Sequence, residues 1–578
     1  MGRWGCTASW CNRLAKCKPG ATTIWTIDAL EEGALDEIEV RVLQQYARFL
    51  VHMRAEKQDR RFGLVLGAGV SLPLKFPSWG DLVTRIADHV DVAGRHIIEG
   101  VGDKLPDTSK TQMLFQHYRS KNIENTKEIQ SAKLERKIQG QWRRIIHDCL
   151  YRNAPKTASE IMDEHPYLKY FIDIIAQSSM TVNYNFDDTI QQLLLFVKGR
   201  SGPFINRGFE TVWNGSLSFR RDTSIIYHPN GFLPRNLLEY PSDNLVFSDD
   251  SFADQLIESM AGHHASLLHH FSKTTCLFIG LSLQDATLRH LLRQSALINP
   301  GHYHYCIQYI RPGAARDDAA EKALFDANFE VYNLITLFLS DDEIAALGRL
   351  LAIDEDDLRH AAEEVGIPLK LCFYLTGAVG AGKTTCLSYF GSFKTYDEWV
   401  EPRNDLLAKS WTDLSDSEKI SLDGWIVRQF NLKNCRLVDQ RVGIFVIDRS
   451  PLDPLAFTDE AEIVSKAKSI AKGLSPGVSG RSLQGGHVIL LTGLADDMEA
   501  RVVGRHKQSK SEVIDKMQYI LSNIFKNSSA TIINTSGLTI HQVLKRVARS
   551  ILIDEYRPTD MSTLLSSIAD GEYCGGIA

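Results

Sequence analysis

Residues 371–385 read LCFYLTGAVGAGKTT, a short apolar run that leads into a glycine-rich turn, a lysine and two threonines. The eight residues from 377 to 384 fit the pattern GxxxxGK(S/T) in full, between a predicted strand and a predicted helix, which is the context that a phosphate-binding P-loop requires. The backbone amides of such a loop surround a β-phosphate, while its lysine reaches the β- and γ-phosphate oxygens. The predicted ATP-binding residues are Gly377, Gly380, Gly382, Lys383, Thr384 and Thr385.

A second apolar run, 443–447, ends in Asp448-Arg449-Ser450. This motif resembles the Asp/Glu-Arg-Ser motif of deoxynucleoside and thymidylate kinases, where the acid lies near the metal and the acceptor and the arginine contacts the acceptor. The resemblance implies a catalytic role for Asp448 and a nucleotide contact for Arg449. It also implies that Thr384 and Asp448 together hold a Mg²⁺ ion.

Two further features resemble the same kinases. Arg501 and Arg505 lie four residues apart, on one face of a predicted helix, and are similar to the arginine-bearing lid of these enzymes. A solvated helix face is the alternative interpretation of both arginines. The segment 397–399 stands where such kinases begin their acceptor pocket. A helical set that could read a base by stacking and hydrogen bonding follows, although Trp425 could equally pack in the core: Asp423, Trp425 and Gln429. The sequence leaves the acceptor open.

The N-terminal half contains a glycine turn of its own. Gly67-Ala68-Gly69-Val70-Ser71 follows a short apolar strand predicted over 62–66. Glycines at such a turn let the backbone approach a pyrophosphate, and the helix that follows presents its amides to the charge. The third glycine of the usual dinucleotide fingerprint is absent, so a tight turn without a ligand explains this motif equally well when it is taken alone.

Four more motifs follow the glycine turn in a fixed order. They are Pro77-Ser78-Trp79-Gly80, 181–187 (TVNYNFD), 228–234 (HPNGFLP) with 246–248 (VFS), and 278–285 (FIGLSLQD). In this order and spacing the set resembles the sirtuin-like family, in particular the bacterial branch that occurs in antiphage defence proteins. The resemblance covers roughly residues 25–330, and five ordered motifs are far more specific than any one of them.

The resemblance implies a role for each motif. Gly67, Ala68, Gly69 and Ser71 match the turn that holds the NAD phosphates, and Asn183 matches the family's asparagine that faces the nicotinamide ribose and orients a water or hydroxyl. The implied reaction is cleavage of the nicotinamide–ribose bond through an oxocarbenium-like state, which is helped by oriented dipoles and by a base near the ribose hydroxyls. Four further residues belong to the predicted NAD site: Asp187, Gly280, Ser282 and Asp285.

The sequence departs from the family pattern at two positions. Asn185 stands where the family has an aspartate, although Asp187 lies close by. Asn230 stands where the family's catalytic histidine precedes a glycine, and the available His228 lies two residues earlier. An asparagine cannot accept a proton at neutral pH as an imidazole does. Three interpretations remain open: His228 takes over the catalytic role, the protein binds NAD without cleaving it, or the chain is an inactivated variant. A purely structural role for His228 is the alternative to the first.

Length and composition set broad limits on the chain. At 578 residues it is too long for one hydrophobic core, and 44% hydrophobic with 24% charged residues is typical of a soluble globular protein. The formal charge of −6 gives no overall basic bias, so we expect no direct nucleic-acid binding. No apolar run reaches the length of a membrane span, and we expect a cytoplasmic protein. Cys6, Cys11 and Cys17 fit no common zinc pattern.

Strand-like runs that alternate with helical patterns predict an α/β protein with two parallel-sheet domains. The runs are 179–182, 224–227, 245–247, 276–279 and 305–309 in the first half. We expect a Rossmann-like sirtuin domain with helical insertions and a P-loop domain of the kinase type. The predicted order is a disordered leader (1–25), the sirtuin-like domain (26–335), a helical connector (336–368), the P-loop domain (369–553) and a peripheral tail (554–578).

The leading functional hypothesis is a defence enzyme that hydrolyses NAD and is controlled by nucleotide binding at the P-loop domain. NAD, ATP and Mg²⁺ are the expected small-molecule partners, and a homo-oligomer is the expected assembly. Two alternatives belong to other classes: a deoxynucleotide kinase with a regulatory NAD-binding domain, and a module in which ATP binding controls assembly. Both leading activities depend on family analogy, because fold alone does not determine function.

Overall fold

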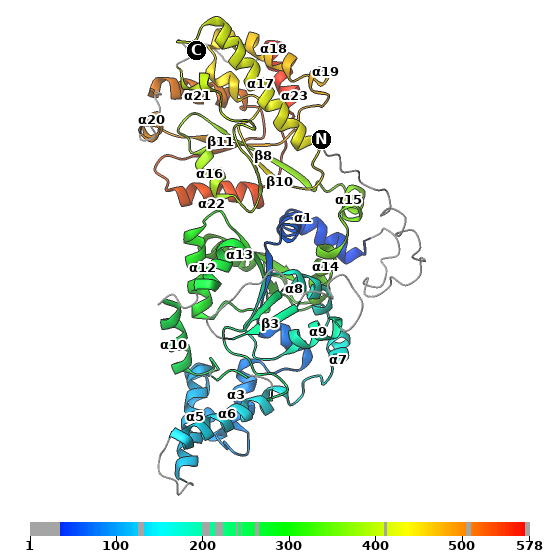
Figure 1. Cartoon of the computed structure of the whole chain (residues 1–578), viewed down its shortest axis with the longest axis vertical. Helices are drawn as coiled ribbons and strands as arrows, with labels where there is room; N and C mark the ends of the chain where they lie inside the picture. The colour runs from blue at the N-terminus through cyan, green and yellow to red at the C-terminus, as the bar shows by residue number, and fades with distance from the viewer. Residues whose placement is uncertain are drawn as a thin grey trace, which may run out of the picture.

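The computed structural model describes residues 35–124, 132–198, 208–213, 223–238, 241–243, 245–260, 265–409, 413–503 and 510–572. The strands in these ranges form one parallel sheet in each half of the chain, seven-stranded in the N-terminal half and five-stranded in the C-terminal half (Figure 1). The predicted α/β class with two parallel sheets is therefore confirmed. The predicted leader, 1–25, lies outside the described residues.

The N-terminal sheet has the strand order β3-β4-β2-β1-β5-β6-β7. Its central strands β1 and β5 are buried along their whole length, which explains why their sequences, FGLVL and TCLFI, are continuously apolar. The chain runs from β1 to one side of the sheet and returns to its other side at β5. Open parallel sheets with such a reversal of strand order bind their ligands in a crevice at the carboxyl ends of the strands, which places the expected site after β1 and β5. The strands are β1 (Phe62–Leu66), β2 (Met180–Asn183), β3 (Gly208–Val212), β4 (Thr223–Tyr227), β5 (Thr275–Ile279), β6 (His304–Tyr309) and β7 (Leu334–Leu339).

Helices cover this sheet and extend beyond it. The described residues of the polar stretch 91–160 form helices, in line with the predicted helical insertions, and two of these helices, α5 and α6, project from one end of the molecule (Figure 1). None of the described helices combines the length and the hydropathy that a membrane-spanning segment requires. The principal helices are α1 (Glu37–Gln58), α2 (Ala68–Ser71), α3 (Trp79–Ala87), α4 (Arg95–Val101), α5 (Asp107–Glu124), α6 (Ala132–Tyr151), α7 (Ala158–Glu164), α8 (Ile172–Gln177), α9 (Thr189–Lys198), α10 (Asp249–Met260), α11 (Ala265–Lys273), α12 (Ala286–Ile298), α13 (Asp318–Tyr332), α14 (Asp341–Ala352) and α15 (Glu355–Glu364).

Two local predictions for this half were wrong. The run 245–247 is not a strand, because its backbone groups serve the turn before α10: the amide of Val246 donates to Asn230 O, and that of Phe247 donates to Ser251 Oγ. The run 334–339 is the edge strand β7, although the sequence suggested a helical connector from residue 336. Two helices, α14 and α15, follow β7, and α14 packs against α1.

The C-terminal sheet has the order β12-β11-β8-β10-β9, with the P-loop strand β8 at its centre. β10 pairs with β8 so that Asp448 lies beside Leu375, next to the start of the glycine-rich turn. The strands are β8 (Lys370–Gly377), β9 (Lys394–Tyr396), β10 (Gly443–Asp448), β11 (His487–Thr492) and β12 (Thr531–Asn534). The helices are α16 (Lys383–Tyr389), α17 (Asp416–Val438), α18 (Ile463–Gly473), α19 (Pro476–Ser479), α20 (Ala495–Val503), α21 (Ser511–Ile524), α22 (Ile540–Leu552) and α23 (Met561–Ala569).

The segment after residue 553, interpreted from the sequence as a peripheral tail, packs onto this sheet. Helix α23 lies against α18 and buries Met561, Leu565 and Ile568. Upstream of it, the hydroxyl of Tyr556 accepts a hydrogen bond from the amide of Cys372 in β8 at 3.1 Å. Described residues of the segment up to 572 therefore complete the core of the C-terminal half.

Helix α1 joins the two halves. Arg48 donates to Ile551 O (3.1 Å) and Asp554 O (2.7 Å) of the C-terminal half. His52 is fully buried between Tyr305 of β6 and Ser392, with ring nitrogens 2.7 Å from Tyr305 Oη and 3.1 Å from Ser392 O. Since a carbonyl can only accept, Nε2 of His52 carries the proton and Nδ1 accepts from the tyrosine. The neutral imidazole thus connects both halves.

Burial lowers the pKa of four histidines on and around this joint. The pKa falls to about 3 for His52 and His270 and to about 4 for His302, and it lies well below the usual value for His304. In the unfolded chain these imidazoles bind a proton near pH 6.5. Between about pH 6.5 and pH 4 the unfolded state therefore binds more protons than the folded state, and stability must fall as the pH falls.

We expect the free energy of unfolding to be highest above pH 6.5 and, on acidification below it, to fall by up to about 1.4 kcal/mol per pH unit for each histidine that stays neutral in the folded protein. Urea denaturation at several pH values between 7.5 and 4.5 measures this slope. His52→Gln keeps a donor for Ser392 O but removes one titrating ring, so its slope should be shallower. His360→Gln, at an exposed position, is the matched control and should match the parent. Equal slopes for all three proteins would contradict the assignment.

Candidate functional site

The glycine turn after β1 packs against the segment that follows β5. Gly67 and Gly69 donate their amides to Ile279 O and Gly280 O, each at 2.9 Å. A Cβ at Gly67 would lie 2.5 Å from the Leu281 side chain, and one at Gly69 would lie 2.7 Å from Gly280 Cα. Gly280 itself has a φ of +71°, a conformation that favours glycine. These glycines are therefore required by the close approach of the two backbone segments that follow β1 and β5.

A buried hydrogen-bond network holds the same turn from the side of β2. Ser71 Oγ donates to Asp187 Oδ2 at 2.9 Å, and Asp187 Oδ1 accepts from the amide of Thr189 at 3.1 Å. Asn185 Nδ2 donates to Gly67 O (2.9 Å) and to Ser71 Oγ (3.0 Å). Burial raises the pKa of Asp187. The network explains the asparagine at 185, because an aspartate could not donate to Gly67 O.

Asn183, the predicted ribose-facing residue, ends β2 beside Leu66, the last residue of β1. It is buried, and its Oδ1 accepts from the amide of Asn185 at 3.1 Å. The structure thus brings Asn183 to the same edge of the sheet as the glycine turn. The amide nitrogen of its side chain is the group that remains for another partner, since Oδ1 already takes part in the turn.

His228 lies at the end of β4 and is completely buried. Its Nδ1 is 2.8 Å from Asn185 O, so Nδ1 carries the proton, and its Nε2 accepts from Gln191 Nε2 at 2.8 Å. Burial lowers its pKa to about 4. Both ring nitrogens are occupied within the protein, and no sequence motif pointed to Gln191 as the residue that fixes this tautomer.

Asn230 is held two residues further on, before Gly231, which has a φ of +103°. Its Oδ1 accepts from Gln255 Nε2 at 3.2 Å, and its Nδ2 donates to Tyr184 O at 3.4 Å. Gln255, on α10, also donates to Pro229 O at 2.9 Å. Gln255 therefore positions the 229–230 turn, although no motif in the sequence pointed to it.

The last predicted motif of this half connects the end of β5 to α12. Ser282 is exposed just after Gly280, whereas Asp285 caps α12 by accepting from the amide of Leu288 at 2.8 Å. The predicted NAD contacts thus all lie at or just after the carboxyl ends of four neighbouring strands, β4, β2, β1 and β5. This placement fits a dinucleotide at the reversal point of the sheet.

The P-loop in the C-terminal half is shaped by three glycines in the left-handed region. Gly377, Gly380 and Gly382 have φ values of +147°, +84° and +97°. A Cβ at Gly377 or Gly380 would lie 2.4 Å from Leu491 O or 2.6 Å from Met498 O, whereas Gly382 faces open space. Lys383 donates from Nζ to the loop carbonyls of residues 377 (2.7 Å) and 378 (2.9 Å). Burial lowers its pKa to about 8.

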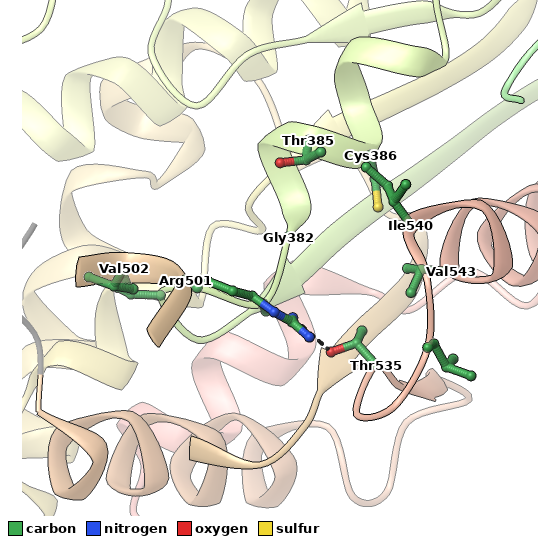
Figure 2. A pocket seen from close by; sticks show the side chains of 12 residues that line it. Gly382, Thr385, Cys386, Arg501, Val502, Thr535, Ile540 and Val543 are labelled. Atoms are coloured by element: carbon green, nitrogen blue, oxygen red, sulfur yellow. Dashed lines mark hydrogen bonds between the residues drawn. The ribbon is translucent and has the colours of Figure 1, made fainter. Parts of the chain in front are cut away.

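A cavity of about 240 Å³ opens beside this loop (Figure 2). Arg501, from α20, reaches across it and donates to Thr535 Oγ1 at 3.4 Å. Apolar side chains form most of the remaining wall, which suits the faces of a planar ring. Arg505, the second predicted lid arginine, lies outside the described residues. The cavity is lined by Val379, Gly380, Ala381, Gly382, Thr385, Cys386, Arg501, Val502, Thr535, Leu538, Ile540 and Val543.

The predicted metal ligands lie next to each other. Thr384 Oγ1 donates to Asp448 Oδ2 at 3.1 Å, and Asp448 Oδ1 is buried with no hydrogen-bond partner in the described chain. Burial raises the pKa of Asp448. Such an unsatisfied oxygen beside a hydroxyl fits Mg²⁺, which takes few protein ligands when it also binds nucleotide phosphates. Among the described residues, no three His, Cys, Asp or Glu side chains form a separate metal cluster.

Arg449 follows Asp448 with a φ of +67°, and its guanidinium contacts two acidic side chains. Its Nε donates to Glu398 Oε1 at 2.6 Å, and Nη1 lies 3.6 Å from Asp453 Oδ2. Lys433 supports the same place by donating to Glu398 O (3.1 Å) and Asp448 O (2.8 Å). No sequence motif contains Lys433; the signal for it is its position four residues after Gln429, on the same helix face.

The side chains suggested to read a base are engaged within the protein. Gln429 accepts from the amides of Val400 (3.0 Å) and Glu401 (2.9 Å), and it donates to Glu401 Oε2 at 2.8 Å. Asp423 forms an ion pair with Lys466. The ring of Trp425 packs against that of Trp399 with centroids 4.8 Å apart. These contacts favour the packing interpretation of this helix.

Comparisons with known proteins bear on both halves. Residues 179–332, the segment from β2 to α13, match the family model described as a SIR2-like domain. No protein of curated function matches the chain in sequence. A solved structure of deoxyadenosine kinase from M. mycoides, with dCMP and dCDP bound, is 14% identical, with a TM-score of 0.25. The similarity covers 31% of this chain and 97% of that one.

Asn185→Asp should destabilise the N-terminal half. The substitution removes both donors to Gly67 O and Ser71 Oγ and places a second carboxylate near buried Asp187, which we expect to cost about 2–4 kcal/mol. Thermal or urea denaturation measures the loss. Asn236→Asp, at an exposed position whose side chain only accepts from the amide of Leu238, is the matched control. Unchanged stability of Asn185→Asp would mean that the network does not depend on these donors.

Proposed function

We propose that the N-terminal half binds NAD in the crevice between β1 and β5 and cleaves its nicotinamide–ribose bond. The observation that carries this proposal is the gathering of the Gly67 turn, Asn183, the 228–231 turn and the 280–285 segment at one edge of the sheet. The match of residues 179–332 to the SIR2-like domain supports an NAD-related role. An oxocarbenium-like state would be stabilised by the oriented amide dipoles of Asn183 and its neighbours.

Position 230 limits the rate in this proposal. Asn230 occupies the place where the resemblance puts a proton-accepting histidine, and an amide cannot serve as that base. The alternative base, His228, is buried with both ring nitrogens hydrogen-bonded, which argues for a positioning role. We therefore propose that the chain binds NAD but turns it over slowly, as an inactivated form would.

We propose that the P-loop half binds ATP with Mg²⁺ and acts as a sensor. Gly382 and the adjoining cavity offer space for the nucleotide, and Thr384 and Asp448 would hold the metal, which would neutralise phosphate charge. A deoxynucleotide kinase remains the second candidate. Two contacts disfavour it. The guanidinium of Arg449 is paired with Glu398 and Asp453, and the side-chain oxygen of Gln429 accepts hydrogen bonds from the backbone amides of residues 400 and 401.

A role in antiviral defence, a cytoplasmic location and assembly into a homo-oligomer belong to the same proposal. They rest on the resemblance to the bacterial defence branch of the sirtuin-like family. Control of assembly by ATP is the third candidate function, and it would use the same nucleotide site.

Asn230→His should restore NAD cleavage. A positioned general base contributes typically about 10²–10⁴-fold, so nicotinamide release should rise by that order over the parent chain. Chromatography of nicotinamide and NAD at fixed time points measures the change, with and without ATP.

Asn183→Ala in the Asn230→His background provides the control and should remove the gain, since the side chain proposed to face the ribose is lost. Equal inactivity of the parent and Asn230→His, with candidate nucleotides present, would contradict the hydrolase proposal. It would favour a domain that only binds NAD.

Lys383→Ala should abolish ATP binding while leaving the fold intact. The ammonium group is the point charge proposed to reach the β- and γ-phosphates, and in the structure it donates to two loop carbonyls. Calorimetric titration with MgATP measures the loss. Lys526→Ala removes an exposed lysine of the same half and should bind like the parent. An unchanged affinity for Lys383→Ala would contradict the assignment of the loop.

A further inference from the structure

The first turn of helix α22 lines the nucleotide cavity, and the following turn contacts the N-terminal half. Ile540 and Val543, in its first turn, line the cavity beside the P-loop (Figure 2). Lys545 then donates from Nζ to Phe329 O and to Asn333 Oδ1, the latter at 2.6 Å. One helix of 13 residues thus carries both the wall of the cavity and an anchor in the other half.

The anchor is a junction of the N-terminal half. Asn333 is buried, has a φ of +53°, and ends α13. Its Nδ2 donates to Pro300 O (3.1 Å) and His302 O (2.9 Å), and its own carbonyl accepts from the amide of His304 at 2.9 Å. Lys545 therefore fixes, through one side chain, the loop between α12 and β6 and the start of β7.

Helix α16, which begins at the end of the P-loop, contacts the same loop at a second place. Tyr389 is the last residue of α16, which begins at Lys383. A Cβ on Gly301 would lie 2.2 Å from Tyr389 O, so the loop 299–302 meets α16 with no free space between their backbones. Close-packed interiors transmit displacement because they cannot compress. Helix α16 thus contacts this loop directly, and α22 reaches it through Lys545 and Asn333.

Helix α12 connects this loop with the dinucleotide crevice. It ends at Ile298, where Leu297 O lies 3.4 Å from His541 Nε2 of α22. It begins after Asp285, its N-cap, in the segment that closes on the Gly67 turn. Its 13 residues span about 20 Å. One end of α12 therefore contacts α22, whose first turn lines the nucleotide cavity, and the other end begins in the segment that follows β5.

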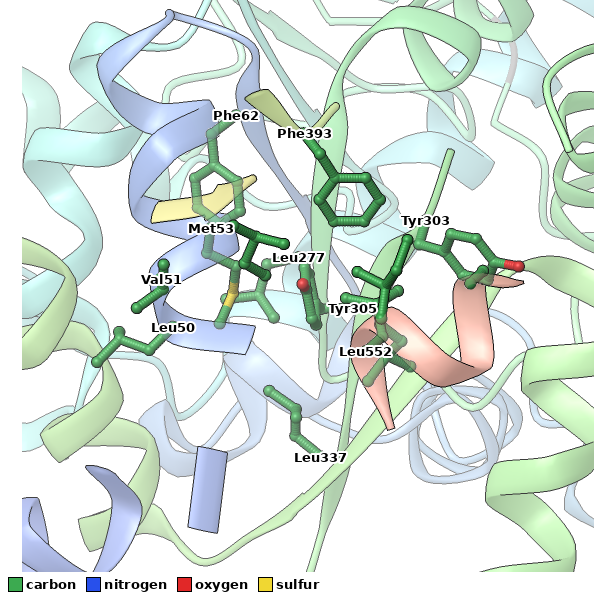
Figure 3. Close-up of a cluster of buried hydrophobic side chains, with 14 of the residues drawn as sticks. Leu50, Val51, Met53, Phe62, Leu277, Tyr303, Tyr305, Leu337, Phe393 and Leu552 are labelled. Atoms are coloured by element: carbon green, nitrogen blue, oxygen red, sulfur yellow. The ribbon is translucent and has the colours of Figure 1, made fainter. Parts of the chain in front are cut away.

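The two halves also share apolar packing next to this route (Figure 3). Phe393, after α16, and Leu552, the last residue of α22, lie with Met53 of α1 and Tyr305 of β6 in one buried cluster. A shift of α22 would have to move these side chains as well. The joint is therefore stiff on both sides of Lys545, which favours movement of the helices as units.

We propose that the nucleotide cavity and the NAD crevice are coupled through α22, the 299–302 loop and α12, so that each ligand changes the affinity for the other. The inference rests on the proposed function of both sites. A nucleotide that fills the cavity contacts Ile540 and Val543 and displaces α22, and the displacement reaches the Asp285 end of α12. Linkage requires that NAD changes nucleotide affinity by the same factor.

Calorimetric titration of the full chain tests the coupling, because slow turnover lets NAD binding be measured directly. In the parent, saturating MgATP should change the NAD dissociation constant by at least about fivefold, and saturating NAD should change that of MgATP equally. Lys545→Met keeps the apolar stem but loses both bonds, so the factor should fall toward one while each ligand still binds. Arg546→Met, exposed on the same helix, is the matched control.

Gly301→Ala provides a second, independent variant, since its methyl group separates the loop from Tyr389 O. It too should weaken the coupling, and Lys545→Met alone decides if this variant does not fold. Binding of both ligands to the parent without mutual effect would overturn the inference and leave the proposed function standing. Failure of the parent to bind either ligand would overturn both. A factor unchanged in Lys545→Met and Gly301→Ala would overturn the route.

Discussion

The burial of α1 between two sheets is the constraint on which the rest of the molecule depends. Its buried positions, which include Val42, Leu50, His52 and Met53, are not confined to one stripe, as expected of a helix that is covered on more than one face. Arg48 and His52 of this helix donate hydrogen bonds to backbone carbonyls of the C-terminal half. This burial requires several imidazoles to remain neutral, so we expect acid to destabilise the packing between the halves.

Around this joint each half builds its site in the same way, from residues that follow the carboxyl ends of neighbouring parallel strands. In the N-terminal half the backbone turns are locked by buried polar side chains, above all Asn185 and Gln255. In the C-terminal half Lys433 and Glu398 hold the backbone and guanidinium next to Asp448. Both sites are thus supported by groups that would not themselves touch a ligand, which keeps the ligand-facing groups in fixed positions.

The two sites differ in which of their groups remain available to a ligand. Beside the P-loop, Gly382 faces open space and one oxygen of Asp448 has no hydrogen-bond partner in the described chain. At the position of the expected histidine, Asn230 is tied to Gln255 and Tyr184, and His228 is saturated. The arrangement suits a nucleotide-responsive C-terminal half and an N-terminal half whose chemistry is restrained. Helices α12 and α22 give these halves a direct mechanical connection.

The sequence by itself determined the parallel α/β class and both glycine turns, because the hydrophobic runs of buried parallel strands and the glycines at their ends depend on local chemistry. It could not show that Gly67 and Gly69 are needed for contact with Gly280, that Gln191 and Gln255 hold His228 and Asn230, or that the segment after residue 553 completes a core. The sequence places residues 336–339 in a helical connector, whereas they belong to an edge strand, which is defined only by its neighbour β6. These features arise from pairings between residues far apart in the chain, and only the tertiary structure decides which partners meet.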